Sequence, residues 1–236
     1  MTGVQTCALP ISTEFSLSRF HQISSELAEE ESPKLSTFLS MFNEITNLFH
    51  CLGSALSFAT SDVTTKLNHL QNRTKEMMMS GLITSSYEEV IIEEIMKAEK
   101  AKNWHLSGPE GVDHKGRDYQ CASRSIVRLI WFLDFVYEMV WYMREEPNES
   151  LQTAVRYAYN KVLSPRHNAL IRNAFKVAVI IVPSKATFIE KISNGHTPQE
   201  VDDYWITCEN NMKTISNKFW TFFKAEGMDD LPSSVS

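Results

Sequence analysis

Residues 48–67 read LFHCLGSALSFATSDVTTKL, an apolar helical segment that turns charged at one end. Counting back from Asp62 in steps of four and three gives Phe58, Ala55 and Cys51, which are apolar or small. Lys66 then follows Asp62 at helical spacing. A solvated i,i+4 ion pair explains these two charges locally and contributes roughly 0.2–0.5 kcal/mol. The stretch predicts a helix, and the neighbouring segments decide between this pair and a role for Asp62 in a site.

Apolar residues recur at helical spacing through almost the whole chain of 236 residues. The chain has only 8 glycines and 8 prolines, which disfavours a turn-rich β fold. Thr197 and Pro198 suit the N-cap and the first position of the last helix. We therefore predict an all-α fold. The predicted helices cover residues 14–31, 35–70, 68–79, 87–101, 121–145, 149–162, 167–182, 185–193 and 198–224.

One domain is expected over residues 13–228. Residues 1–12, MTGVQTCALPIS, resemble a translated sequencing adapter and lack the basic start of a signal peptide, so they are predicted to be foreign or disordered. Residues 103–119 contain three glycines and one proline and predict an exposed loop insertion. Residues 229–236 predict a disordered tail.

Composition excludes several classes of function. A net charge of −6 and a pI near 5.7 disfavour nucleic acid as a partner, because phosphate binding calls for a basic excess. The cysteines are far apart and match no metal-ligand spacing, so we predict reduced thiols in a cytosolic protein, with no metal or other cofactor. The most apolar stretch, residues 125–143, carries Arg128, Asp134 and Glu138 and predicts a buried central helix. The cysteines are Cys7, Cys51, Cys121 and Cys208.

Three predicted helices change chemistry at one end. Residues 121–145 begin with Arg124 and Arg128 and continue as an apolar stripe, residues 167–182 open with His167, and residues 35–70 end with Asp62 and Lys66. Antiparallel packing brings these polar ends to one level above a shared apolar space. Cations at a helix N-terminus oppose the macrodipole, which favours an anionic partner there. The pattern indicates an apolar cavity with a charged mouth. Taken one by one, the same residues are also explained by a solvated helix start and a capping histidine.

The segments LFHCLGSALSFATSDVTTKL, SRSIVRL, YNKVLSPRH and IRNAFKVAVIIVPSKATFI resemble, in order and spacing, the glycolipid transfer protein superfamily. The resemblance covers roughly residues 35–195. It is strongest to the ceramide-1-phosphate transfer branch, which includes a plant accelerated-cell-death protein. This resemblance implies a two-layer sandwich of about eight helices that encloses one lipid. It also implies cytoplasmic transfer of sphingolipids between membranes without covalent chemistry.

By position, the resemblance assigns Asp62 to the amide N–H and hydroxyl of the sphingoid base and His167 to the amide carbonyl. Lys66, Arg124 and Arg128 fall at the family's phosphate-binding positions. Glycolipid carriers of the family have Asn in place of Lys66 and Trp in place of Arg128, so the expected ligand is a sphingolipid with a phosphate headgroup. A phosphate monoester needs several cationic donors, and these residues supply them.

One departure concerns membrane docking. Many family members read His-Gly-Trp where this chain has His167, Asn168 and Ala169, which weakens the case for aromatic insertion into the membrane. Transient docking is then expected to use other residues of the same region. These are Leu163, Leu170, Lys161, Arg166 and Arg172.

Three alternatives to transfer of ceramide-1-phosphate stay open at this point. Glycolipid transfer is the first, and a lipid-sensing regulatory module that does not transfer lipid is the second. The third is an enzyme that uses Asp62, His167 and Lys66, against which stands the lack of a nucleophile motif, a phosphate-cradling loop or a metal set. The sequence predicts no oligomeric state.

Overall fold

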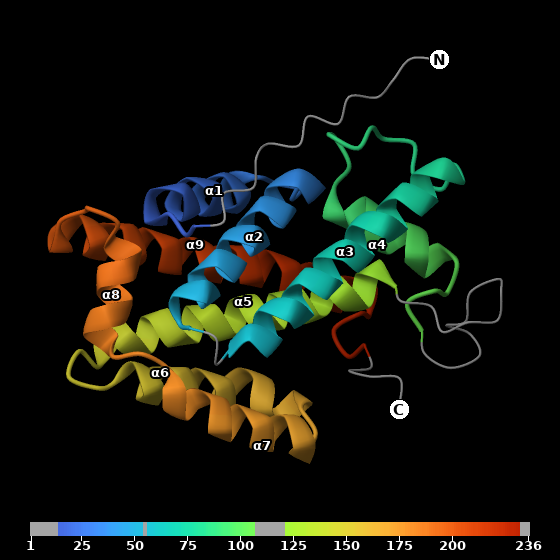
Figure 1. Ribbon diagram of the computed structural model, residues 1–236. Helices are drawn as coiled ribbons and strands as arrows, with labels where there is room; N and C mark the ends of the chain where they lie inside the picture. Colours follow the sequence, from blue (N-terminus) through green and yellow to red (C-terminus); the bar gives the residue numbers. More distant parts are fainter. Residues whose placement is uncertain (1–13, 54–55, 107–120, 232–236) are drawn as a thin grey trace.

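The structure is a computed structural model that describes residues 14–53, 56–106 and 121–231 (Figure 1). These residues form nine α-helices and no β-strand, which confirms the predicted all-α class. A short π-helix and a 3₁₀ turn, Tyr159–Leu163 and Ser164–Arg166, connect the sixth and seventh helices. The helices are α1 (Leu17–Glu29), α2 (Leu35–Cys51), α3 (Ser57–Met79), α4 (Ile92–Ala101), α5 (Ala122–Glu145), α6 (Leu151–Ala158), α7 (Ala169–Ala178), α8 (Lys185–Ser193) and α9 (Pro198–Glu226).

Helix α5 is the central element, as predicted for residues 121–145. It runs through the middle of the molecule, with α1 and α9 to one side and α6 and α7 to the other (Figure 1). It packs against α3, α4, α6 and α9, and most of its residues are buried. Among the described helices, none has the length and apolar character to cross a membrane.

The prediction of one helix over residues 35–70 is wrong. Helix α2 ends at Cys51 and α3 begins at Ser57, so the predicted helix over 68–79 is the second half of α3. Gly53 has φ of +88°, a left-handed conformation that glycine adopts without steric cost. Leu52 and Leu56 flank the turn and are both buried, so the apolar periodicity continues through the break and hides it.

Smaller differences concern the ends of elements. The helix predicted from residue 87 begins at Ile92, and the one predicted from 167 begins at Ala169. The last helix begins as expected, with Thr197 as N-cap and a capping box closed by Glu200. Leu231, which was assigned to the disordered tail, is buried in the core.

Several predictions fall wholly or partly outside the described residues. They concern the foreign segment 1–12 with Cys7, Ala55 in the first stripe, residues 107–119 of the loop, and the tail from 232. Within the described part of the loop, the side chain of His105 is buried rather than exposed. Cys51, Cys121 and Cys208 are free thiols, as predicted.

A buried carboxylate holds the start of α5. Glu99 on α4 accepts hydrogen bonds from the backbone N–H groups of Ala122 and Ser123, at 2.8 and 2.7 Å, and from the Ser123 hydroxyl at 2.7 Å. Its side chain is fully buried. A carboxylate at a helix N-terminus satisfies otherwise unpaired donors and interacts favourably with the macrodipole. Glu99 therefore fixes the position of α5 relative to α4.

Replacing this carboxylate should destabilise the fold. We expect Glu99→Ala to lower the free energy of unfolding by about 1–3 kcal/mol, because two buried N–H groups lose their acceptor. Urea denaturation measures the change. Glu93→Ala on the same helix is the control, since Glu93 pairs with Lys97 on the surface at 3.3 Å and its loss should cost less than about 1 kcal/mol. Equal effects of the two substitutions would contradict the role given to Glu99.

Candidate functional site

A cavity of about 470 Å³ lies between α3, α5 and the segment that runs from the π-helix into α7. Its inner wall includes the rings of Phe49, Phe132 and Phe135, with centroids 4.8 Å apart for Phe49 and Phe132 and 5.7 Å apart for Phe132 and Phe135. Leu129 and Val63 add aliphatic surface. The cavity therefore has a predominantly apolar interior.

The structure brings four of the five predicted site residues to this cavity. Asp62 and Lys66 reach it from α3, Arg128 from α5, and His167 from the start of the α7 segment. Arg124 does not line it. Arg124 is buried one turn before Arg128 and donates a hydrogen bond from its Nε to the Cys121 sulfur at 3.2 Å. The arrangement brings together an acid, two bases and a histidine, while their roles toward a ligand stay predictions.

Asp62 and Lys66 form an ion pair in the structure. Assigning Asp62 to the lipid amide implied that it would not be the surface partner of Lys66; that expectation is wrong, although both residues also line the cavity. The Asp62 side chain is 65% exposed and that of Lys66 only 12%. Burial lowers the pKa of Lys66, and the Asp62 charge opposes that shift. The pair thus lies at the mouth, with Asp62 toward solvent and Lys66 largely covered.

His167 is held by an aromatic residue of the π-helix. The Tyr159 hydroxyl lies 3.0 Å from Nδ1 of His167, and the Tyr159 ring stacks on Phe175 of α7 at 3.5 Å between centroids. A neutral imidazole that accepts the Tyr159 proton at Nδ1 carries its own proton on Nε2. His167 then has one N–H to donate to another group.

The charges around His167 favour this neutral form. Burial lowers the pKa of His167, and Lys66, Arg166 and Arg172 lower it further, while the Asp62 carboxylate opposes them. With an ordinary pKa of about 6.5, a further lowering makes the ring neutral at physiological pH. The cavity thus offers a neutral N–H donor beside a carboxylate acceptor.

Several residues that line the cavity were not predicted from the sequence, including three with polar or aromatic side chains. Tyr159 belongs to a predicted helix that in fact changes to a π-helix, whose wider turn is common at functional sites. Trp131 was placed only in an apolar stripe, and Arg166 was assigned to membrane docking, yet both line the cavity. The only sequence signal for Arg166 is its place directly before His167.

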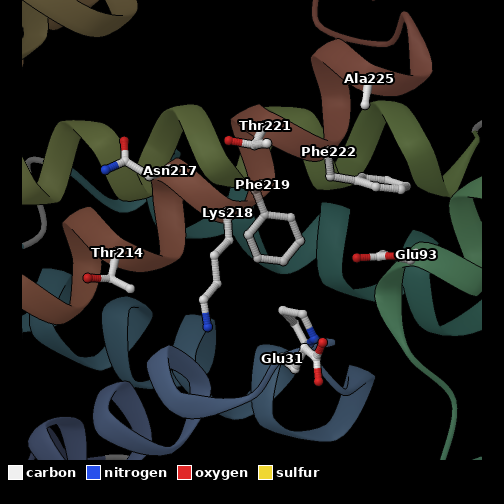
Figure 2. A pocket seen from close by; sticks show the side chains of 10 residues that line it. Glu31, Glu93, Thr214, Asn217, Lys218, Phe219, Thr221, Phe222 and Ala225 are labelled. Carbon is white, nitrogen blue, oxygen red and sulfur yellow. The ribbon is translucent and has the colours of Figure 1, made fainter.

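A second hollow, of about 560 Å³, lies on another part of the surface, where the α1–α2 connection and α4 meet α9 (Figure 2). Its charged residues include Glu31, Glu93 and Lys218. Lys218 extends from α9 and donates hydrogen bonds to the backbone carbonyls of Ala28 and Glu30, at 2.6 and 2.8 Å. This cation already caps the end of α1. The hollow therefore lacks the group of cations beside an aromatic wall that marks the first cavity.

A model of the glycolipid transfer protein (GLTP) family matches residues 33–194, which is more than half of the chain. The match includes Asp62, Lys66, Arg128 and His167 at the mouth of the cavity. The chain belongs to the GLTP family. The GLTP fold predicted from the sequence resemblance is thereby confirmed.

Known relatives of this GLTP-family chain point to one branch. A ceramide-1-phosphate transfer protein from Danio rerio is 26% identical over 191 residues, which are 79% of this chain and 84% of the relative. The crystal structure of the apo form of mouse ceramide-1-phosphate transfer protein superposes with a TM-score of 0.76 at 19% identity, covering 92% of this chain and 100% of the other. Human ceramide-1-phosphate transfer protein in complex with 12:0 ceramide-1-phosphate gives a TM-score of 0.74 at 18% identity, covering 92% and 98%.

The lowered pKa of His167 predicts part of the pH dependence of stability. The unfolded chain takes up the proton more readily than the folded chain, so stability falls as pH drops below about 6.5. His167→Gln removes this group. We expect the melting temperature to fall less in the variant than in the parent when the pH is lowered from 7.5 to 5.

Thermal melts across this pH range provide the measurement. His69 and His105, whose pKa values burial also lowers, remain in both proteins, so the difference between the two curves isolates His167. Parallel curves for parent and variant would show that His167 does not contribute.

Proposed function

We propose that this chain carries ceramide-1-phosphate between membranes without covalent chemistry. The observation that supports it is the pairing of Lys66 and Arg128, two largely covered cations, with Asp62 and His167 at the mouth of an apolar cavity. Cations alone suit many anions, and an apolar cavity alone suits many lipids. Their combination suits a lipid whose phosphate, amide and hydrocarbon chains follow one another.

The amide of the lipid is assigned to Asp62 and His167. An unpaired amide N–H or carbonyl at an apolar site costs about 1–3 kcal/mol. Asp62 accepts from the N–H and the neighbouring hydroxyl, and the N–H of His167 donates to the carbonyl. The Tyr159 hydroxyl, 3.0 Å from the other ring nitrogen, keeps His167 in the tautomer that this donation needs.

The phosphate is assigned to Lys66 and Arg128. An arginine fork and a lysine ammonium both donate charge-assisted hydrogen bonds to phosphate oxygens. Arg124 is close enough to Arg128 to lower its pKa, although burial is the larger cause. Because Arg124 does not line the cavity, we propose that it adds positive potential behind Arg128 rather than a direct contact.

The hydrocarbon chains need more room than the cavity has. A volume of about 470 Å³ is in the lower half of the usual range for small-ligand pockets, about 300–1,000 Å³. Two long chains therefore require the wall of Phe49, Phe132 and Phe135 to separate. Rings packed side by side can move apart along the cavity and let a chain enter between α3 and α5. This gives binding a conformational cost that shorter chains avoid.

We propose that the exposed face of α7 and of the 3₁₀ turn that follows it, Val179–Ile181, docks on the membrane. Four apolar side chains are 63–78% exposed there, namely Leu170, Val177, Ile180 and Ile181. Exposed apolar groups of this kind are typical of surfaces that contact a partner or a membrane. We call this group the α7 patch. It lies in the segment that also supplies the cavity residues His167 and Ile171, so docking places the mouth against lipid.

The docking residues expected from the sequence are distributed differently in the structure. Leu170 belongs to the α7 patch, whereas Leu163 lines the cavity. Lys161 forms an ion pair with Glu138 at 2.8 Å, and Arg172 donates to the Ser164 carbonyl at 3.3 Å. Membrane contact and a cytoplasmic location stay predictions.

A competition experiment tests the function. We expect vesicle-to-vesicle transfer of ceramide-1-phosphate to exceed that of a glucosylceramide with the same chains. Asp62→Asn should weaken binding of both short-chain ceramide-1-phosphate and short-chain ceramide by roughly 10- to 100-fold, because a charged acceptor is lost. Lys66→Ala should weaken mainly the phosphate lipid. Calorimetric titration with both lipids measures the two patterns.

The same experiment separates the other functions. Preference for glucosylceramide would indicate a glycolipid carrier, and binding without transfer would indicate a lipid-sensing module. Chemical change in the lipid during incubation would indicate an enzyme. If Asp62→Asn binds both lipids like the parent, Asp62 serves only as the surface partner of Lys66.

Polar substitution of the α7 patch should separate docking from lipid binding. We expect Val177→Ser with Ile180→Ser to reduce vesicle binding and transfer rate by at least several-fold, because apolar area is lost from the membrane contact. Binding of a short-chain lipid in solution should not change. Met79→Ser, which alters an 89% exposed side chain at the far end of α3, is the control. Equal transfer rates in all three proteins would argue against docking by this face.

A further inference from the structure

Arg166 is a cavity residue to which the proposed function assigns no role. It ends the 3₁₀ turn Ser164–Arg166 and lines the cavity directly before His167. Its guanidinium carbon lies 4.7 Å from the ring centroid of Trp131 on α5. With Lys66 on α3 and Arg128 on α5, Arg166 brings a cation to the cavity from a third element.

The contacts of Arg166 leave most of its hydrogen-bonding capacity unused. Its Nη1 donates to the Val162 carbonyl, and no carboxylate of the described residues lies within 4.0 Å of its guanidinium. Burial lowers the pKa of Arg166 and the Asp134 carboxylate opposes this shift, yet Asp134 accepts its hydrogen bonds from Ser216 and, at 2.9 Å, from the Trp220 indole. A guanidinium has five N–H donors. A half-buried cation of this kind is suited to an anion that the protein itself does not supply.

Two features of Trp131 bear on the role of Arg166. Its ring fixes the plane of the Arg166 guanidinium by a cation–π contact, which lowers the entropy lost when that group binds a ligand. Its own indole N–H is buried and has no acceptor among the described residues. Trp131 lines the same cavity. Trp131 therefore orients the Arg166 guanidinium at one wall of the site, and its own buried indole N–H is left without an acceptor in the described part of the chain.

Building on the proposed function, we propose that Arg166, held on Trp131, is a further headgroup-binding residue that selects a phosphate monoester over a phosphodiester. A monoester carries a charge of about −1.5 to −2 at pH 7 and three acceptor oxygens. A phosphocholine headgroup has a single negative charge, fewer terminal oxygens and a quaternary ammonium that the guanidinium repels. A third cation at the mouth thus favours the monoester and disfavours the zwitterion.

Titrations of soluble short-chain lipids test this role. The ligands are ceramide-1-phosphate, ceramide and sphingomyelin, and the proteins are the parent, Arg166→Gln, Arg166→Lys and Arg156→Gln. Arg156 is the matched control, since it is exposed on α6 and does not line the cavity. We expect Arg166→Gln to weaken ceramide-1-phosphate about 10- to 100-fold and to leave ceramide nearly unchanged. The preference for ceramide-1-phosphate over sphingomyelin should fall by a similar factor.

The lysine variant separates charge from fold. Arg166→Lys keeps the cation but loses the planar fork, so it should recover part of the affinity for ceramide-1-phosphate. It also keeps the test valid if Arg166→Gln melts at a lower temperature. Arg156→Gln should bind all three lipids like the parent.

Two results would overturn the role of Arg166. Unchanged binding of ceramide-1-phosphate by Arg166→Gln, in a parent that prefers this lipid, rejects the role and leaves the proposed function intact. An equal loss of ceramide and ceramide-1-phosphate assigns Arg166 to the fold of the turn. A parent that shows no preference for ceramide-1-phosphate rejects the proposed function itself.

Discussion

The cavity depends on how the first two turns of α5 tolerate positive charge. Arg124 and Arg128 lie where the helix macrodipole is already positive, and no acidic residue occupies the first turn of α5. The compensating carboxylate comes from α4, where Glu99 accepts hydrogen bonds from the first backbone N–H groups. The Cys121 sulfur accepts from Arg124 in addition. These contacts hold a cationic helix end against an apolar cavity, and the proposed headgroup site depends on it.

The opposite wall is built where the helix type changes. Between α6 and α7 the chain forms a π-helix and then a 3₁₀ turn, and Tyr159, Leu163, Arg166 and His167 from this stretch line one cavity. Their spacing of i, i+4, i+7 and i+8 corresponds to one helical face, and the irregular turns keep these side chains together while the chain passes from α6 to α7. Stacking of Tyr159 on Phe175 then ties this segment to α7. The stretch thus gives the histidine ring its hydrogen-bond partner and brings the third cation to the cavity.

The positions of the mouth and the α7 patch suggest how transfer avoids exposing the lipid chains to water. Asp62 is the exposed member of the mouth, while Lys66 and Arg128 are largely covered. Under the proposed function, a lipid that leaves a membrane would pass from the α7 patch to a wall of aromatic rings, so its hydrocarbon would meet apolar surface at each stage. The phosphate would replace Asp62 as the partner of Lys66 or join it. Either exchange would keep the buried ammonium paired, which a low-dielectric site requires.

The sequence by itself determined the helical class, the central place of α5 and four of the polar residues at the cavity, because apolar periodicity and the position of a charge along a helix are local properties. Family resemblance then supplied the ligand that the charges suit. Gly53 suggests a bend or a close approach of another helix within the predicted helix 35–70, but the full break there was not predicted, since Leu52 and Leu56 are buried on both sides and the periodicity shows no interruption. Only the tertiary structure decided that Asp62 and Lys66 line a cavity while they pair with each other, that Arg124 does not line it, and that Arg166 stacks on Trp131 at its wall. The Asp62–Lys66 pair is local to one helix, but the cavity around it and the ring that Arg166 meets depend on contacts between elements far apart in the chain, which no pattern within one helix specifies.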